Sequence, residues 1–187
     1  MQKYTLGILA GGQGRRAGGV DKGWLPWRGQ PLIQYPLDRF AASAGDIIIS
    51  ANREQERYQQ LPAKIVADAQ SGFLGPLAGL EMLLTHCTLW PLLVITCDAP
   101  NLPNDLPERM LEQLSAATPL CVAHDGERQQ HLCLAFLDAA PLPSLKTSLH
   151  SDQRSVYGWL QGQPVTRVSF PNAAEQFRSI NQPEQDN

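Results

Sequence analysis

The chain has 187 residues, of which 43% are hydrophobic and 18% are charged, and its formal net charge at pH 7 is −3. This composition excludes a disordered chain, a coiled coil and a collagen-like repeat, and the length suffices for one domain with a buried core. The chain has no apolar run near the ~20 residues that cross a bilayer, no signal-peptide pattern and no basic excess. We therefore expect a cytoplasmic protein that binds neither membranes nor nucleic acid.

Short apolar runs alternate along the chain with amphipathic stretches. The runs that predict strands are 4–9, 46–51, 64–67, 92–97, 120–124, 131–137 and 165–170, and the stretches that predict helices are 32–44, 76–86, 106–116 and 154–161. This alternation predicts an α/β fold, with one doubly wound and mostly parallel sheet in a single domain over residues 1–187.

Two details modify that pattern. The turn-rich segment 124–128 lies between two β runs and predicts a short antiparallel element in the C-terminal half. Pro141 and Pro143 predict a loop. The cysteines have no CxxC spacing and the histidines no ligand-like spacing, so we expect reduced, buried thiols and no zinc site.

The most informative segment is LAGGQGRRAGGVDKG, which runs from Leu9 to Gly23 and directly follows the first predicted strand. Its glycines let backbone N–H groups converge on phosphate oxygens, and Arg15, Arg16 and Lys22 add cationic donors. The first 40 residues also hold six of the 15 Lys and Arg residues but only two of the 18 Asp and Glu residues. This pattern predicts a loop that binds the phosphates of a small anionic ligand.

Several kinds of loop compete for this segment. A Walker A loop is excluded, because Lys22 is followed by Gly23 and no hydroxyl is left for Mg²⁺. A dinucleotide-binding fingerprint matches residues 12–17, but Gly18 and Gly19 would break the helix that this fingerprint opens. A triphosphate-binding loop of the nucleotidyltransferase type and a glycine-rich surface turn without a ligand remain.

The segment resembles the signature LAGG…R-x-GG-x-DKG of the molybdenum cofactor guanylyltransferases, also called the molybdopterin-guanine dinucleotide biosynthesis protein A family. Further segments resemble that family in the same order along the chain: the apolar stretch ending in GQPL at 29–32, SANR at 50–53, GPLAG at 75–79, CDAP at 97–100 and NQPE at 181–184. The chain departs from the family at Ala17, where the family usually has Met, and at Ser50, where it can carry a base-contacting Asn.

The resemblance implies a Rossmann-like nucleotidyltransferase fold and a Mg²⁺-dependent enzyme. Such an enzyme transfers GMP from GTP to the terminal phosphate of molybdopterin and releases pyrophosphate. This phosphate is itself the nucleophile, so no nucleophilic triad is required. Rival functions are cytidylyl transfer to the same cofactor, sugar-phosphate guanylyl transfer and nucleotide binding without turnover. Because molybdopterin is labile, other proteins of the molybdenum cofactor pathway are expected as partners for hand-over.

Two aspartates that end predicted strands are candidates for the metal and the base. Asp98 follows the run 92–97, where one carboxylate with triphosphate oxygens and waters can hold Mg²⁺. The resemblance makes Asp98 the metal ligand, with Asn181 as an accessory oxygen. Asp68 follows the run 64–67, and its carboxylate can accept hydrogen bonds from guanine N1–H and N2–H₂.

These arguments assign the site residues. The predicted catalytic residues are Arg16, Lys22 and Asp98. The predicted nucleotide-binding residues are Leu9, Ala10, Gly11, Gly12, Lys22, Ser50, Asn52, Asp68 and Asp98. Whether Ser50 or Asn52 contacts the base is left open, and so is whether Trp24 and Trp27 wall the site or pack the loop against the sheet. The N-terminal part is expected to bind GTP and the C-terminal part to face the pterin, with 125–128 as a candidate rim.

Overall fold

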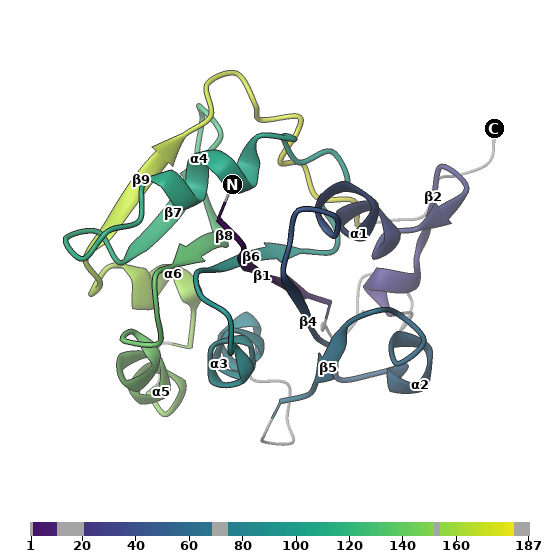
Figure 1. Cartoon of the computed structure of the whole chain (residues 1–187), viewed down its shortest axis with the longest axis horizontal. Coiled ribbons are helices and arrows are strands. Elements are labelled where there is room, and N and C mark those ends of the chain that lie inside the picture. The colour runs from purple at the N-terminus through teal and green to yellow at the C-terminus, as the bar shows by residue number, and fades with distance from the viewer. Residues whose placement is uncertain (1, 11–20, 69–74, 152–153, 182–187) are drawn as a thin grey trace.

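A sheet forms the middle layer of the molecule (Figure 1). The computed structural model describes residues 2–10, 21–68, 75–151 and 154–181. Within these residues seven strands pair in the order β5-β4-β1-β6-β8-β7-β9. The strands are β1 (Thr5–Leu9), β4 (Asp46–Ser50), β5 (Lys64–Val66), β6 (Leu92–Thr96), β7 (Leu120–His124), β8 (Gln129–Phe136) and β9 (Val165–Ser169).

The sheet has a parallel and an antiparallel part. Strands β5, β4, β1 and β6 run parallel to one another, with β1 paired to β4 and β6 over its whole length. Strand β8 is antiparallel to both β6 and β7, and β9 returns parallel to β7. The mostly parallel α/β sheet and its antiparallel C-terminal element are therefore confirmed. The central strands β1 and β6 are buried along almost their entire length, as strands covered on both faces must be.

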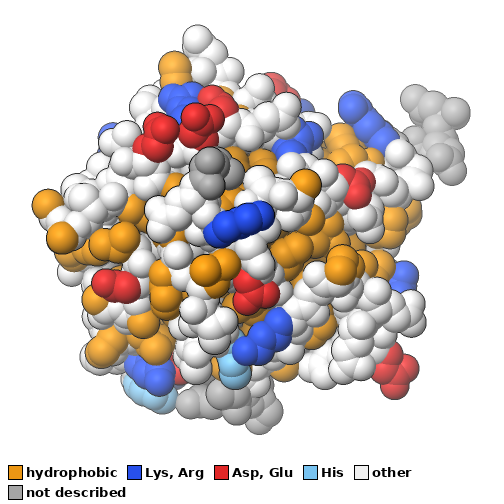
Figure 2. All heavy atoms as spheres, viewed as in Figure 1, with side chains coloured by type: hydrophobic (Ala, Val, Ile, Leu, Met, Phe, Trp, Pro, Cys, Tyr) orange, Lys and Arg blue, Asp and Glu red, His pale blue; other side chains and the backbone are white. Residues whose placement is uncertain are grey.

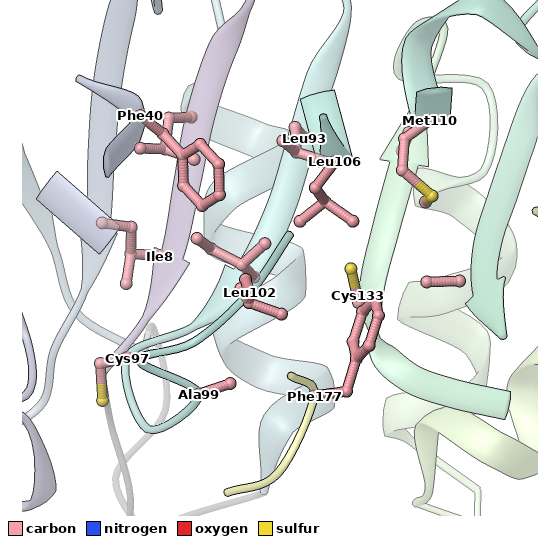
Figure 3. Close-up of a cluster of buried hydrophobic side chains, with 14 of the residues drawn as sticks. Ile8, Phe40, Leu93, Cys97, Ala99, Leu102, Leu106, Met110, Cys133 and Phe177 are labelled. Carbon is pink, nitrogen blue, oxygen red and sulfur yellow. The ribbon is translucent and has the colours of Figure 1, made fainter. Parts of the chain in front are cut away.

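Helices cover both faces of the sheet (Figure 1). One face carries α3 (Pro76–His86), α5 (Leu142–Leu149) and α6 (Val156–Leu160), and the other carries α1 (Gln34–Phe40) and α4 (Leu106–Glu112). The short helix α2 (Gln55–Tyr58) adds Tyr58 to the core on the α1 and α4 side. Figure 3 shows part of that core, which the helix residues Phe40, Leu106 and Met110 share with the sheet residues Ile8, Leu93 and Cys133.

The helix predictions are correct in place but too long at several ends. The structure also contains a helix, α5, where the two prolines predict a loop, so that prediction is wrong. Pro141 is the N-cap of α5 and Pro143 lies in its first turn. Proline is tolerated there because the first N–H groups of a helix have no partner within the helix.

Smaller elements between β1 and β5 have no counterpart among the predictions. They are the 3₁₀ helix η2 (Lys22–Trp24), the helix α2 and the antiparallel pair β2 (Pro26–Trp27) and β3 (Gln30–Pro31). Arg28 and Gly29 connect β2 to β3 with positive φ angles of 45° and 85°, and positive φ at both central residues is typical of a tight hairpin turn.

The surface carries charges of both signs. On the face drawn in Figure 2, Lys and Arg side chains alternate with Asp and Glu side chains rather than gathering into one basic area.

None of the helices in the described ranges is both long enough and apolar enough to span a bilayer. All four cysteines are buried and unpaired, as the sequence predicts.

Candidate active site

Two adjoining pockets lie where the parallel strands end. The smaller has a volume of about 190 Å³ and lies over the ends of β1, β4, β5 and β6. The larger has a volume of about 420 Å³ and lies between the end of β6 and the start of β8. Thr96, Asp98 and Leu132 line both pockets. Asp98 therefore stands where the two pockets meet, at the edge where open α/β sheets bind ligands.

A lysine contacts Asp98 at this junction. Lys22, the first residue of η2, forms an ion pair with Asp98 Oδ2 and donates a hydrogen bond of 2.7 Å to Asn181 Oδ1. The backbone N–H of Ile180 donates to the carbonyl oxygen of Asp98 at 2.8 Å, which places Asn181 beside the pair. Residues from three distant parts of the chain thus meet at one point.

The second oxygen of Asp98 is unsatisfied. Asp98 Oδ1 is buried and has no hydrogen-bond partner among the described residues. In the same described ranges no group of three or more His, Cys, Asp or Glu side chains could hold a metal ion. One carboxylate with a free oxygen and a neighbouring amide oxygen fits Mg²⁺, which usually takes one or two carboxylates together with substrate phosphates and waters. The donor set therefore suits a metal that enters with a phosphate ligand.

Asp68 and Asn52 form a reciprocal pair in the smaller pocket. Asn52 Nδ2 donates to Asp68 Oδ2 at 2.7 Å, and the backbone N–H of Asp68 donates to Asn52 Oδ1 at 2.8 Å. Burial raises the pKa of the Asp68 carboxyl, and the hydrogen bond from Asn52 opposes that rise. Asp68 Oδ1 is buried without a partner in the described part of the chain. It is therefore an acceptor held in place and ready for a ligand donor.

The rest of the smaller pocket is formed by closely packed backbone. The N–H of Ala10 donates to the carbonyl oxygen of Ser50 at 2.9 Å, so the ends of β1 and β4 stay together. Gly79 of α3 approaches this point so closely that a Cβ there would lie 2.9 Å from both Leu9 Cδ2 and Ser50 Oγ. A side chain at this position would force Leu9 or Ser50 to move, so glycine lets α3 pack against the pocket floor without disturbing them.

Every predicted nucleotide-binding residue that the structure describes lines the smaller pocket. These residues are Leu9, Ala10, Lys22, Ser50, Asn52, Asp68 and Asp98. The predicted residues Gly11, Gly12 and Arg16 lie outside the described ranges. The structure thus brings the described residues together, while their individual roles remain predictions.

The two tryptophans pack rather than line either pocket. Trp24 lies against Tyr58, with ring centroids 4.9 Å apart, and Trp27 is buried with Leu25 and Leu32. Of the segment 125–128, Arg128 lines the larger pocket.

Sequence reasoning gave no role to Asp21 and Tyr58. Both are buried, and the Tyr58 hydroxyl donates to Asp21 Oδ1 at 2.6 Å. The position of Asp21 directly before Lys22 was the one available signal.

The chain matches a known protein family and has relatives of similar length. Residues 6–166 match the family described as the MobA-like NTP transferase domain. The chain is 38% identical over 179 residues to the molybdenum cofactor guanylyltransferase of Shewanella piezotolerans, covering 95% of this chain and 87% of that protein. It is 40% identical over 179 residues to the protein of the same name from Shewanella amazonensis, covering 95% and 91%.

Solved structures show the same fold. The crystal structure of molybdopterin-guanine dinucleotide biosynthesis protein A from Archaeoglobus fulgidus superimposes with a TM-score of 0.78. The superposition covers 96% of this chain and 93% of that one, at 18% sequence identity. A nucleotidyl transferase from Methanothermobacter thermautotrophicus superimposes with a TM-score of 0.72 over 97% and 93% of the two chains, at 16% identity.

Proposed function

The chain belongs to the MobA-like NTP transferase family, and on this premise we propose that it transfers GMP from GTP to the terminal phosphate of molybdopterin. The products are the guanine dinucleotide form of the cofactor and pyrophosphate. One observation carries this proposal. Lys22 and Asp98, 76 residues apart in sequence, meet at the junction of two pockets, and the smaller pocket also holds the unpartnered oxygen of Asp68.

The smaller pocket suits the nucleotide. Guanine presents N1–H and N2–H₂ as adjacent donors, whereas cytosine and adenine lack that pair. Asp68 offers Oδ1 for these donors, and Asn52 fixes the orientation of its carboxylate. Of the two candidates for base contact, Asn52 therefore acts through Asp68, while Ser50 is almost fully buried at the pocket floor.

The junction suits the phosphates. Lys22 places a cationic donor beside Asp98, and its ammonium can exchange these oxygens for those of a triphosphate. Asp98 and Asn181 would hold Mg²⁺. When bound there, the metal would neutralise charge on the α-phosphate and on the departing pyrophosphate.

The larger pocket suits the acceptor. A phosphate monoester with a second pKa near 6 is largely dianionic at pH 7, so it needs no general base before it attacks. Its oxygen forms a bond to the α-phosphorus of GTP, the bond from that phosphorus to the α–β bridging oxygen breaks, and the bridging oxygen leaves with pyrophosphate. The exposed Arg128 side chain lines this pocket and can pair with the acceptor phosphate.

The test follows pyrophosphate release from the protein with Mg²⁺, molybdopterin and each nucleoside triphosphate in turn. We expect release with GTP and little with CTP or ATP. Asp68→Asn should lower kcat/KM for GTP by about 10- to 100-fold, the effect of losing a hydrogen-bonded charged acceptor. Asp105→Asn is the matched control, because Asp105 is exposed and lines neither pocket. Release that prefers CTP would contradict the proposal.

A further inference from the structure

A buried aspartate precedes the lysine of the site, and one of its carboxylate oxygens accepts a hydrogen bond from a tyrosine of another element. Asp21 is only 4% exposed and is the N-cap of η2. Its Oδ1 accepts a hydrogen bond from the Gly23 N–H at 3.0 Å and another from the Tyr58 hydroxyl at 2.6 Å. The first bond closes the turn that contains Lys22, and the second ties that turn to α2.

Tyr58 is placed to be a permanent donor. It is fully buried at the end of α2, and burial, with the nearby Cys97 and Asp21, raises the pKa of its hydroxyl. The hydroxyl therefore keeps its proton and donates to Asp21. Burial raises the pKa of Asp21 as well, while the hydrogen bonds from Tyr58 and Gly23 oppose that rise. Removing either side chain would therefore leave the other buried without this hydrogen bond.

Gly23 and Trp24 of the turn also pack closely against α2. A Cβ on Gly23 would collide with the Tyr58 hydroxyl, so only glycine lets the turn approach this far. Trp24 packs its ring against that of Tyr58, and the Arg57 guanidinium lies over the Trp24 ring, 4.1 Å from its centroid. The turn of Lys22, Gly23 and Trp24 is therefore packed against α2.

Fixing this turn matters because the lysine side chain is long. A free lysine explores many rotamers, and holding its ammonium at one place is opposed by the loss of that freedom. With the backbone of Lys22 anchored on both sides, by Asp21 before it and by Trp24 after it, fewer arrangements of the ammonium compete with the one at the pocket junction.

We infer that Tyr58 is a positioning residue, which acts through Asp21 to hold the turn that aims Lys22 at the phosphates of the nucleotide. The inference rests on the proposed function, because it assigns Tyr58 a part in binding the triphosphate. Tyr58 lines neither pocket, so the role inferred for it is an indirect one.

The experiment compares the affinities of Tyr58→Phe and wild-type protein for GTP and for GMP by calorimetry. The substitution keeps the ring and removes only the hydroxyl. We expect GTP to bind about tenfold more weakly and GMP to bind equally well, because Lys22 serves the outer phosphates. Tyr4→Phe is the matched control: Tyr4 is also fully buried and its hydroxyl bonds Ser43 at 2.8 Å, away from the site. It should leave both affinities unchanged.

Two further variants test the route through Asp21 and Lys22. Asp21→Asn keeps an oxygen that can accept from Gly23 and Tyr58, and should retain GTP affinity, whereas Asp21→Ala should lose about tenfold. In a Lys22→Met background, Tyr58→Phe should have no further effect on GTP affinity, because coupled positions are not additive. An equal loss of GMP and GTP affinity, or a full tenfold loss in that background, would overturn the inference.

The outcomes separate the inference from the proposed function. If the wild-type protein binds GTP no better than CTP, the guanine assignment fails, while the comparison of triphosphate with monophosphate still tests Tyr58. If GTP is preferred and Tyr58→Phe binds it as tightly as the wild type, the proposed function stands and the inference fails.

Discussion

At the scale of single residues, the charged groups of the site contact one another and can exchange these contacts for contacts with a ligand. The ammonium of Lys22 contacts Asp98 Oδ2 and Asn181 Oδ1, and so it lies on the two side chains that are proposed to hold Mg²⁺ when the triphosphate is bound. This contact lowers the cost of holding a partly buried carboxylate before substrate binds.

This arrangement predicts that Lys22→Met strengthens the binding of a divalent cation to the protein without nucleotide. Removing the ammonium frees both oxygens, so Mn²⁺ titration followed by electron paramagnetic resonance should show affinity raised severalfold. Turnover of GTP should fall about 100-fold or more, because a preorganised charge at the phosphates is lost. Lys64→Met, on an exposed strand position, is the control. An unchanged Mn²⁺ affinity in Lys22→Met would show that the ammonium does not compete for this place.

At the scale of elements, the turn between β7 and β8 is held by one buried carboxylate. Asp125 is fully buried and accepts from the N–H groups of Glu127 and Arg128 at 2.8 Å each and from Gln130 Nε2 at 2.5 Å. Burial alone would raise the pKa of Asp125, but these hydrogen bonds and the nearby Arg128 charge outweigh it and lower the pKa below its usual value.

The lowered pKa makes the turn sensitive to acid. In the native state Asp125 binds its proton less readily than in the unfolded chain, so its contribution is complete above the unfolded pKa of about 3.9 and is lost as the pH falls through the native value. Asp125→Ala should reduce the free energy of unfolding at pH 7 by about 3 kcal/mol, since several hydrogen bonds to a charged acceptor disappear.

Urea denaturation at pH 7 and near pH 3 measures both effects. The difference in stability between the two pH values should be smaller in Asp125→Ala and in Asp125→Asn than in the wild type. Asp138→Asn is the control, because Asp138 is an exposed turn aspartate that accepts a hydrogen bond from the Ala140 N–H. Equal acid sensitivity in the wild type and Asp125→Asn would contradict the assignment.

The elements differ in how far the sequence predicts them. Buried parallel strands such as β6 can be recognised in the sequence as unbroken apolar runs. Because the carboxyl ends of parallel strands meet at one edge of the sheet, the sequence pattern predicts that Asp98 and Asp68 lie at the same edge, as they do. Helix α5 cannot be recognised in this way, because prolines at its start look the same in sequence as prolines in a loop. The bond between Tyr58 and Asp21 joins residues 37 apart. No local pattern predicts such a contact, since it depends on how α2 packs.

At the scale of the whole molecule, two cores share one sheet. Cys133 belongs to the core on the α1 and α4 side, and Cys87 to the core on the α3, α5 and α6 side. Burial raises the pKa of Cys133 to about 12, and it also raises the pKa of Cys87. Both thiols are therefore largely buried and protonated in the native state, and each reports on one face.

The shared sheet predicts that both faces unfold together. Thiol labelling across a urea series should be slow before the transition and should give the same midpoint for Cys87 and Cys133 as the loss of far-ultraviolet circular dichroism. Cys87→Ala and Cys133→Ala serve to assign each signal. Labelling of one thiol at clearly lower urea would mean that one layer opens before the other.

The position of Asp98 between the two pockets has a consequence for how this protein could diversify. The smaller pocket, proposed for the nucleotide, draws mainly on the ends of the parallel strands and the start of α3, whereas about half of the lining of the larger pocket comes from residues 128–133 of the antiparallel part. The two pockets thus rest largely on different stretches of chain and have only Thr96, Asp98 and Leu132 in common among the described residues. Substitutions at residues 128–131 and 133, which line the larger pocket and not the smaller one, should therefore alter the acceptor that is bound and leave the lining of the smaller pocket intact.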